Sequence, residues 1–91
     1  MRYAWKSDAN QREIVLHLVE TGHCVEIMKP PCPWDLTVWR RGGSNFALLE
    51  LKSRYGRPTD NQADFHERSE GCPRAYVRSP EEAYEFVTRV C

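Results

Sequence analysis

Three side chains that can carry out hydrolytic chemistry lie within the stretch 34–52, namely Asp35, Glu50 and Lys52. Two apolar runs in this stretch flank the Gly-Gly pair at 42–43, which predicts a tight hairpin because both central residues of such a turn need a positive φ. If these glycines form the two-residue loop, Asp35 and Glu50 face each other across the strand pair. Lys52 then leaves the same face of the sheet as Glu50, because side chains alternate along a strand.

Two carboxylates that face each other repel, so this register needs a positive charge between them. A hard divalent cation with oxygen ligands meets this need. We therefore expect Asp35 and Glu50 to hold Mg²⁺ or Mn²⁺ together with the main-chain carbonyl of Leu51. Such an ion lowers the pKa of a bound water and neutralises a phosphate, and Lys52 can orient that water or stabilise charge developing on phosphorus. The pattern indicates metal-assisted hydrolysis of a phosphodiester.

Four arginines lie at the hairpin tip and in the loop that follows Lys52, where they can hold phosphates: Arg40, Arg41, Arg54 and Arg57. A structural interpretation of the acidic residues stays open. Asp35 can simply begin a strand, and Glu50 with Lys52 can form a solvated pair at a strand end, since a Glu-x-Lys spacing is common by chance.

Length and composition bound the class of protein. The chain has 91 residues, 41% hydrophobic and 29% charged, with a formal net charge of zero. This predicts one soluble domain spanning residues 1–91 and argues against a protein that coats nucleic acid through bulk positive charge. No apolar run is long enough for a membrane span or a signal peptide, so we expect no membrane partner and a cytoplasmic location. None of the four cysteines forms a Cys-x-x-Cys pair, which is typical of reduced thiols in an intracellular protein.

The apolar periodicity predicts the element order α-β-β-β-α-β-α. Strands are expected at 23–29, 36–39, 46–51 and 74–78, with helices from Ser7 or Asp8 to Gly22, from Thr59 to Gly71 and from Pro80 onward. The fold class is therefore α/β, a small mixed sheet with helices on both faces. The strand at 46–51 is apolar on both sides apart from its terminal charges, so we place it at the centre of the sheet.

The predicted helices carry recognisable starts and faces. Asp8 to Gln11, Thr59 to Gln62 and Ser79 to Glu82 match N-terminal capping patterns. The buried stripe of the first helix is expected to contain Ile14, Val15, Leu18 and Val19, with Gln11 on the same side and Glu13 pointing outward. The second helix presents Gln62, Phe65, His66 and Ser69 on one face. We interpret His66 as a surface or half-buried residue that can reach the site, and Trp34 and Trp39 as packing residues. A second interpretation of Trp34 stays open, namely that it lines a nucleic-acid groove.

Together these residues resemble the PD-(D/E)xK nuclease superfamily, which has the restriction-endonuclease-like fold. Within it the chain is similar to the small VRR-NUC and archaeal-type Holliday junction resolvase branches. The matching pieces are QREIVLHLVETGHCVEI, PWDLTV, LLELKS and PTDNQADF, followed by a strand and the SPEEA helix.

The resemblance implies metal ligation by Asp35 and Glu50 and a catalytic role for Lys52. It also matches Gln62 to a glutamine that helps to orient the site. Two departures stand out: Trp34 replaces the proline that often precedes the Asp, and Gln11 occupies the position of a metal-associated Glu on the first helix. A neutral Gln11 is a weaker metal ligand than a Glu would be. The affinity for the metal and the number of ions bound therefore stay open.

These observations predict a Mg²⁺- or Mn²⁺-dependent endonuclease that acts on branched DNA, such as Holliday junctions, in recombination or repair. A homodimer is expected, because symmetric cutting of two strands needs two sites. Two alternatives stay open. One is a catalytically weak or inactive nucleic-acid-binding module on the same fold, which Gln11 favours. The other is an α/β interaction domain with no role in nucleic-acid binding.

Overall fold

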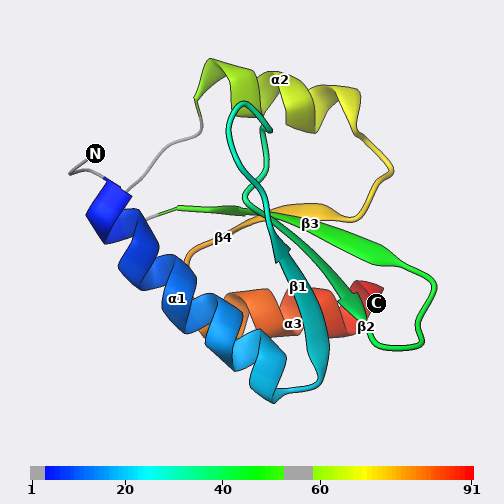
Figure 1. Cartoon of the computed structure of the whole chain (residues 1–91). Coiled ribbons are helices and arrows are strands. Elements are labelled where there is room, and N and C mark those ends of the chain that lie inside the picture. Colours follow the sequence, from blue (N-terminus) through cyan, green and yellow to red (C-terminus); the bar gives the residue numbers. More distant parts are fainter. Residues whose placement is uncertain (1–3, 53–58) are drawn as a thin grey trace.

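The computed structural model describes residues 4–52 and 59–91, with side chains from residue 10 onward. The elements follow the predicted order: α1 (Ala4–Glu20), β1 (His23–Ile27), β2 (Leu36–Arg40), β3 (Phe46–Leu51), α2 (Asp60–Arg68), β4 (Arg74–Val77) and α3 (Pro80–Val90). The fold is thus mixed α/β, with a four-stranded sheet flanked by three helices (Figure 1). Two of the predicted phosphate-holding residues, Arg54 and Arg57, lie outside the described residues.

The strands lie in the order β1-β2-β3-β4, so β3 is an interior strand, as predicted. The pairs β1–β2 and β2–β3 are antiparallel, whereas β3–β4 is parallel. Leu36 pairs with Leu49 and Trp39 with Phe46. This is the register predicted from the Gly-Gly pair, and it brings the end of β3 that carries Glu50 next to the start of β2.

The turn between β2 and β3 differs from the predicted two-residue loop. β2 ends at Arg40 and β3 begins at Phe46, so the connection is longer than two residues. Gly42 has a positive φ of 82°, but Gly43 does not. Gly43 instead donates its N–H to the carbonyl of Arg40 at 2.7 Å. The register is preserved because the wider loop is still centred on the two glycines.

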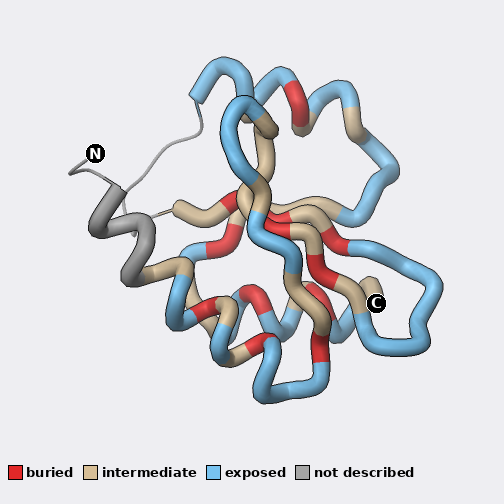
Figure 2. The backbone as a smooth tube through the Cα atoms, viewed as in Figure 1, coloured by how far each residue is buried: buried red, intermediate tan, exposed pale blue. Residues whose placement is uncertain are grey.

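The apolar core lies on one face of the sheet, beneath α1 and α3, while α2 covers part of the other face (Figures 1 and 2). Alternation along the strands separates the two faces, since Ala47 and Leu49 of β3 point into the core and Glu50 points to the α2 side. The fully buried core residues come from α1, α3 and three strands: Ile14, Leu18, Leu36, Val38, Ala47, Leu49, Val77, Ala83 and Val87.

Helix α2 is fastened to the sheet by a few specific contacts. Phe65, its one buried residue, stacks on Trp34 with ring centroids 5.0 Å apart. At its start, Gln62 forms the predicted capping box with Thr59 and also contacts Nζ of Lys52, directly after β3. Near its end, Arg74 of β4 donates to the hydroxyl of Ser69 at 3.0 Å. The helix is therefore held at both ends and in the middle, without adding to the main core.

Helix α1 departs from the prediction at two points. It begins at Ala4, so the predicted cap at Ser7 or Asp8 is wrong and those residues lie inside the helix. Val19, expected in the buried stripe, is 52% exposed, while Ile14 and Leu18 are fully buried. The helix is thus buried along a narrower stripe than its apolar residues suggest. Among the described residues, none of the helices is long and apolar enough to cross a membrane.

The start of α3 provides a test of the predicted cap. The hydroxyl of Ser79 accepts the N–H of Glu82 at 3.1 Å. We expect Ser79→Ala to lower the free energy of unfolding by about 1 kcal/mol, because it leaves this N–H unpaired. The matched control is Thr88→Ala on the exposed side of the same helix, expected to change stability by no more than about 0.5 kcal/mol. Urea denaturation followed by circular dichroism measures both; equal losses would contradict the capping role.

Candidate functional site

Asp35 closes the pairing between β2 and β3 with its main chain and its side chain. Its N–H donates to the carbonyl of Leu49 at 2.9 Å, and its Oδ2 accepts the N–H of Leu51 at 2.8 Å. Its own carbonyl accepts the N–H of Met28 at 2.8 Å. Asp35 thus binds the main chain of β3 on either side of Glu50. This fixes its carboxylate beside the end of β3, and no hydrogen bond to its Oδ1 is found among the described residues.

Glu50 is a charged residue type with no solvent exposure. Both of its carboxylate oxygens are buried, and neither has a well-formed hydrogen bond among the described residues. Burial raises the pKa of Glu50 to about 7; the positive charge of Lys52 opposes this rise, the charge of Asp35 adds to it, and Arg74 opposes it. The influence of Asp35 on the pKa means that the two predicted carboxylates interact electrostatically.

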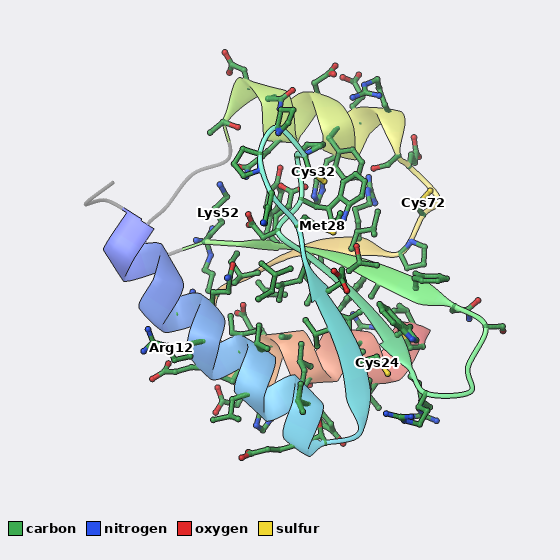
Figure 3. The ribbon with its side chains drawn as sticks, in the orientation of Figure 1. Arg12, Cys24, Met28, Cys32, Lys52 and Cys72 are labelled. Atoms are coloured by element: carbon green, nitrogen blue, oxygen red, sulfur yellow. The ribbon has the colours of Figure 1, made fainter. Side chains whose placement is uncertain are left out.

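Lys52 extends from the end of β3 toward the α2 side of the sheet (Figure 3). Its Nζ is in close contact with Oε1 of Gln62 on α2. The same oxygen accepts the N–H of Thr59 at 3.2 Å as part of the capping box. Gln62 therefore caps the helix and contacts the ammonium group of Lys52 through the same amide oxygen.

His66 was interpreted from the sequence as a surface or half-buried residue that can reach the site, and the structure places it half-buried against Glu50. Its Nε2 lies 2.8 Å from Oε2 of Glu50, although the two atoms are not aligned as a hydrogen bond. The ring stacks on Tyr76 of β4, with centroids 4.0 Å apart and planes 7° from parallel. Burial, with the nearby charge of Arg74, lowers the pKa of His66. Its position four residues after Gln62, on the same helix face, is the sequence signal for this placement.

Arg74 of β4 supplies a positive charge that acts on both Glu50 and His66. Its guanidinium donates to the carbonyl of His66 and to the hydroxyl of Ser69, so it is committed to holding the end of α2. Its positive charge opposes the rise in the pKa of Glu50 that burial causes, and it adds to the lowering of the pKa of His66. Arg74 therefore links the placement of α2 to the electrostatics of the buried carboxyl.

Three predicted residues lie away from this group. Gln11 is half-buried on α1, which packs on the opposite face of the sheet from α2 (Figure 1), and no hydrogen bond joins it to Asp35 or Glu50 in the described part of the chain. Arg40 and Arg41 are exposed at the other end of β2, about 17 Å along the strand from Asp35. They can contact only a ligand that extends along the hairpin.

The donor set fits a divalent cation with oxygen ligands. Glu50 offers two buried oxygens without hydrogen-bond partners, and Asp35 offers a second carboxylate whose charge is felt at Glu50. No cluster of three or more His, Cys, Asp or Glu side chains suited to a metal ion is found within residues 10–52 and 59–91, whose side chains the structure describes. The remaining positions would therefore fall to main-chain carbonyls, such as that of Leu51, and to water, as Mg²⁺ sites often have.

No family model, no curated protein and no solved structure matches the chain. Membership of the nuclease superfamily therefore stays a prediction from the sequence. The described residues establish the mixed α/β fold and the placement of the side chains around Glu50.

The pKa of Glu50 predicts how stability changes with pH in chelator-treated protein. Because the folded-state pKa is raised from 4.5 to about 7, the folded protein binds more protons than the unfolded chain between these values. The contribution of Glu50 to stability is then fully present below pH 4.5 and is lost as the pH rises through 7. Relative to wild type, Glu50→Gln should gain up to about 3 kcal/mol of unfolding free energy across this window.

Urea denaturation of wild type and Glu50→Gln at a series of pH values measures this difference. The exposed Glu85→Gln exchange removes the same formal charge and serves as the control. If the difference in unfolding free energy between wild type and Glu50→Gln stays constant with pH, burial does not raise the pKa of this carboxyl. Taking the difference also separates Glu50 from His66, whose lowered pKa acts in the opposite direction and removes stability as the pH falls.

Proposed function

We propose that the chain is a metal-dependent endodeoxyribonuclease of the PD-(D/E)xK type, with the restriction-endonuclease-like fold and closest to the VRR-NUC and Holliday junction resolvase branches. The observation that carries this proposal is the buried Glu50 carboxyl beside Asp35, which has no well-formed hydrogen bond among the described residues. Lys52 follows two residues later, directly after the end of β3. An ionised carboxylate that is buried without a well-formed hydrogen bond is costly, and a bound cation lowers that cost. The proposed setting is a cytoplasmic homodimer acting on branched DNA.

The roles follow from the contacts. Asp35 and Glu50 would hold Mg²⁺ or Mn²⁺, with the carbonyl of Leu51 as a further ligand. When bound, the ion supplies a water of lowered pKa and neutralises charge on the scissile phosphate. Lys52 places an ammonium group at the same strand end, where it stabilises charge developing on phosphorus. Gln62 fixes the orientation of that ammonium group through its amide oxygen.

Cation and proton compete for the same oxygens in this proposal. Glu50 has a pKa of about 7, so near neutral pH its carboxyl is partly protonated when no cation is present. Ligation requires the ionised form, and binding therefore releases protons. His66, held neutral by its lowered pKa, sits against the same carboxyl and limits the positions that Glu50 can adopt.

Access for DNA is best supported on the side of Asp35 and Lys52. Both residues are half-buried, whereas Glu50 is fully covered. The segment that carries Arg54 and Arg57 follows Lys52 directly in the sequence. A phosphate that approaches from this side would meet the ammonium group of Lys52 before the buried carboxyl of Glu50, which suits a polyanionic substrate.

The second candidate is a nucleic-acid-binding module with weak or absent catalysis. The observation that favours it is the position of Gln11: it is neutral, lies on the other face of the sheet and has no hydrogen bond to Asp35 or Glu50 in the described part of the chain. The site then has two carboxylates rather than three. With fewer charged ligands, the affinity for the metal would be lower.

Cleavage assays with labelled junction, linear duplex and single-stranded DNA, with and without Mn²⁺ or Mg²⁺, test the proposal. We expect Glu50→Gln to abolish metal-dependent cleavage, and Lys52→Ala to reduce it at least about 100-fold while DNA binding is retained. Lys29→Ala is the matched control, since Lys29 is an exposed lysine outside the site. Metal-independent binding without any cleavage by wild type would favour the binding module. Full activity of Glu50→Gln would refute the role of this residue.

His66 acts in this proposal as a positioning residue for Glu50. We expect His66→Ala to weaken Mn²⁺ affinity and to lower cleavage at saturating DNA by about 10- to 100-fold. High Mn²⁺ should restore part of the activity, because the carboxylate ligands remain. His17→Ala, which changes a histidine on α1 away from the site, is the control. Unchanged Mn²⁺ affinity, measured by calorimetry, would mean that His66 only packs against Tyr76.

A further inference from the structure

The outer side of α1 carries an apolar surface that the proposed chemistry does not use. Leu16 and Val19 of α1 and Ile27 of β1 are 55%, 52% and 48% exposed. Together with Val15, Gln11 and Arg12 they line a groove of about 540 Å³. Single exposed apolar residues are common on protein surfaces, whereas exposed apolar residues that gather around one groove are a feature of interaction sites.

The charges on this side of α1 are arranged in a regular order. Arg12, Leu16 and Glu20 are spaced four residues apart, so they form one stripe along the helix, basic at one end, apolar in the middle and acidic at the other. All three side chains are exposed, and Arg12 lies on the outer side of α1 in Figure 3. Within the described residues, neither Arg12 nor Glu20 forms an ion pair.

We propose that this stripe, Arg12–Leu16–Glu20 with Val19 and Ile27 beside it, is the interface through which two copies of the chain form a homodimer. An antiparallel pairing of the two α1 helices about a two-fold axis at Leu16 brings Leu16 onto Leu16 of the second copy. The same pairing sets Arg12 opposite Glu20 twice. A parallel pairing would instead face Arg12 with Arg12 and Glu20 with Glu20, so the charges select the antiparallel arrangement.

The location of this surface is compatible with two working sites. α1 packs on the opposite face of the sheet from α2, which covers Glu50 (Figure 1). A dimer joined through α1 therefore leaves both α2 faces open to ligands. The inference specifies the contact for the homodimer in the proposed function, but association can be measured without metal or DNA, so its failure is distinguishable from failure of the nuclease chemistry.

The contact is small, since each copy contributes one helix face and the end of an edge strand. Interfaces of this kind fall at the lower end of the range for specific association. We therefore expect a dissociation constant in the micromolar range, at which the monomer and dimer exchange as the protein is diluted. Most of the affinity should come from the apolar centre, and the charged ends should set the orientation.

Analytical ultracentrifugation over a concentration series, from about 1 to 200 µM, tests the proposal. Wild type should shift from monomer to dimer, and Leu16→Glu should stay monomeric because it places two like charges at the two-fold axis. The control is Phe46→Glu, which changes a residue of similar exposure on β3 and should still dimerise. Circular dichroism confirms that each variant is folded. A wild type that stays monomeric throughout would overturn the proposal and leave the groove to a different partner.

A charge exchange tests the orientation. Arg12→Glu and Glu20→Arg should each weaken dimerisation at least about tenfold, because each sets like charges against each other. The double variant R12E/E20R should restore the wild-type dissociation constant, since the antiparallel pairing then has both charges reversed. Single variants that dimerise as well as wild type, or a double variant that does not recover, would refute the antiparallel contact.

Discussion

The burial of the Glu50 carboxyl is the constraint on which the site depends. Glu50 lies on the interior strand β3, has no solvent exposure and has no well-formed hydrogen bond among the described residues. Such a group is costly to bury in its ionised form, so the neighbouring residues have to supply either a proton or positive charge. Both effects act on Glu50. Burial raises its pKa to about 7, so that its carboxyl retains a proton more readily, while the positive charges of Lys52 and Arg74 stabilise the ionised form. The side chains around Glu50 either contact its carboxyl, as His66 does, or change its pKa through their charge, as Lys52, Asp35 and Arg74 do.

The local features of this arrangement were predictable from the sequence. The register of β2 and β3 follows from two apolar runs around a glycine pair, and the pairing of Leu36 with Leu49 confirms it. The starts of α2 and α3 follow from short capping patterns at Thr59 and Ser79. Each of these signals acts over a few residues, where backbone hydrogen bonding decides the structure. The element order could be predicted for the same reason.

The features that were missed depend on contacts between distant parts of the chain. His66 reaches Glu50, and Tyr76 stacks on His66, only because parallel β4 lies next to β3 and α2 crosses above them. Helical spacing places His66 on the same face as Gln62, but it does not show which strand residues that face contacts. The start of α1 and the exposure of Val19 were missed for a related reason, since helical spacing shows which residues share a side but not how wide a strip the sheet covers.

The two faces of the sheet differ in what holds their helices, and this difference connects the site to the placement of α2. On the α1 and α3 side the helices are fixed by the apolar core. α2 has one buried residue, Phe65, and otherwise depends on polar contacts. Gln62 contacts Lys52, His66 contacts Glu50, and Arg74 donates to the end of the helix. Any ligand that changes the position or charge of Glu50 therefore changes the free energy that keeps α2 in place. By linkage, a shift of α2 must change the affinity of the site for that ligand by the same amount.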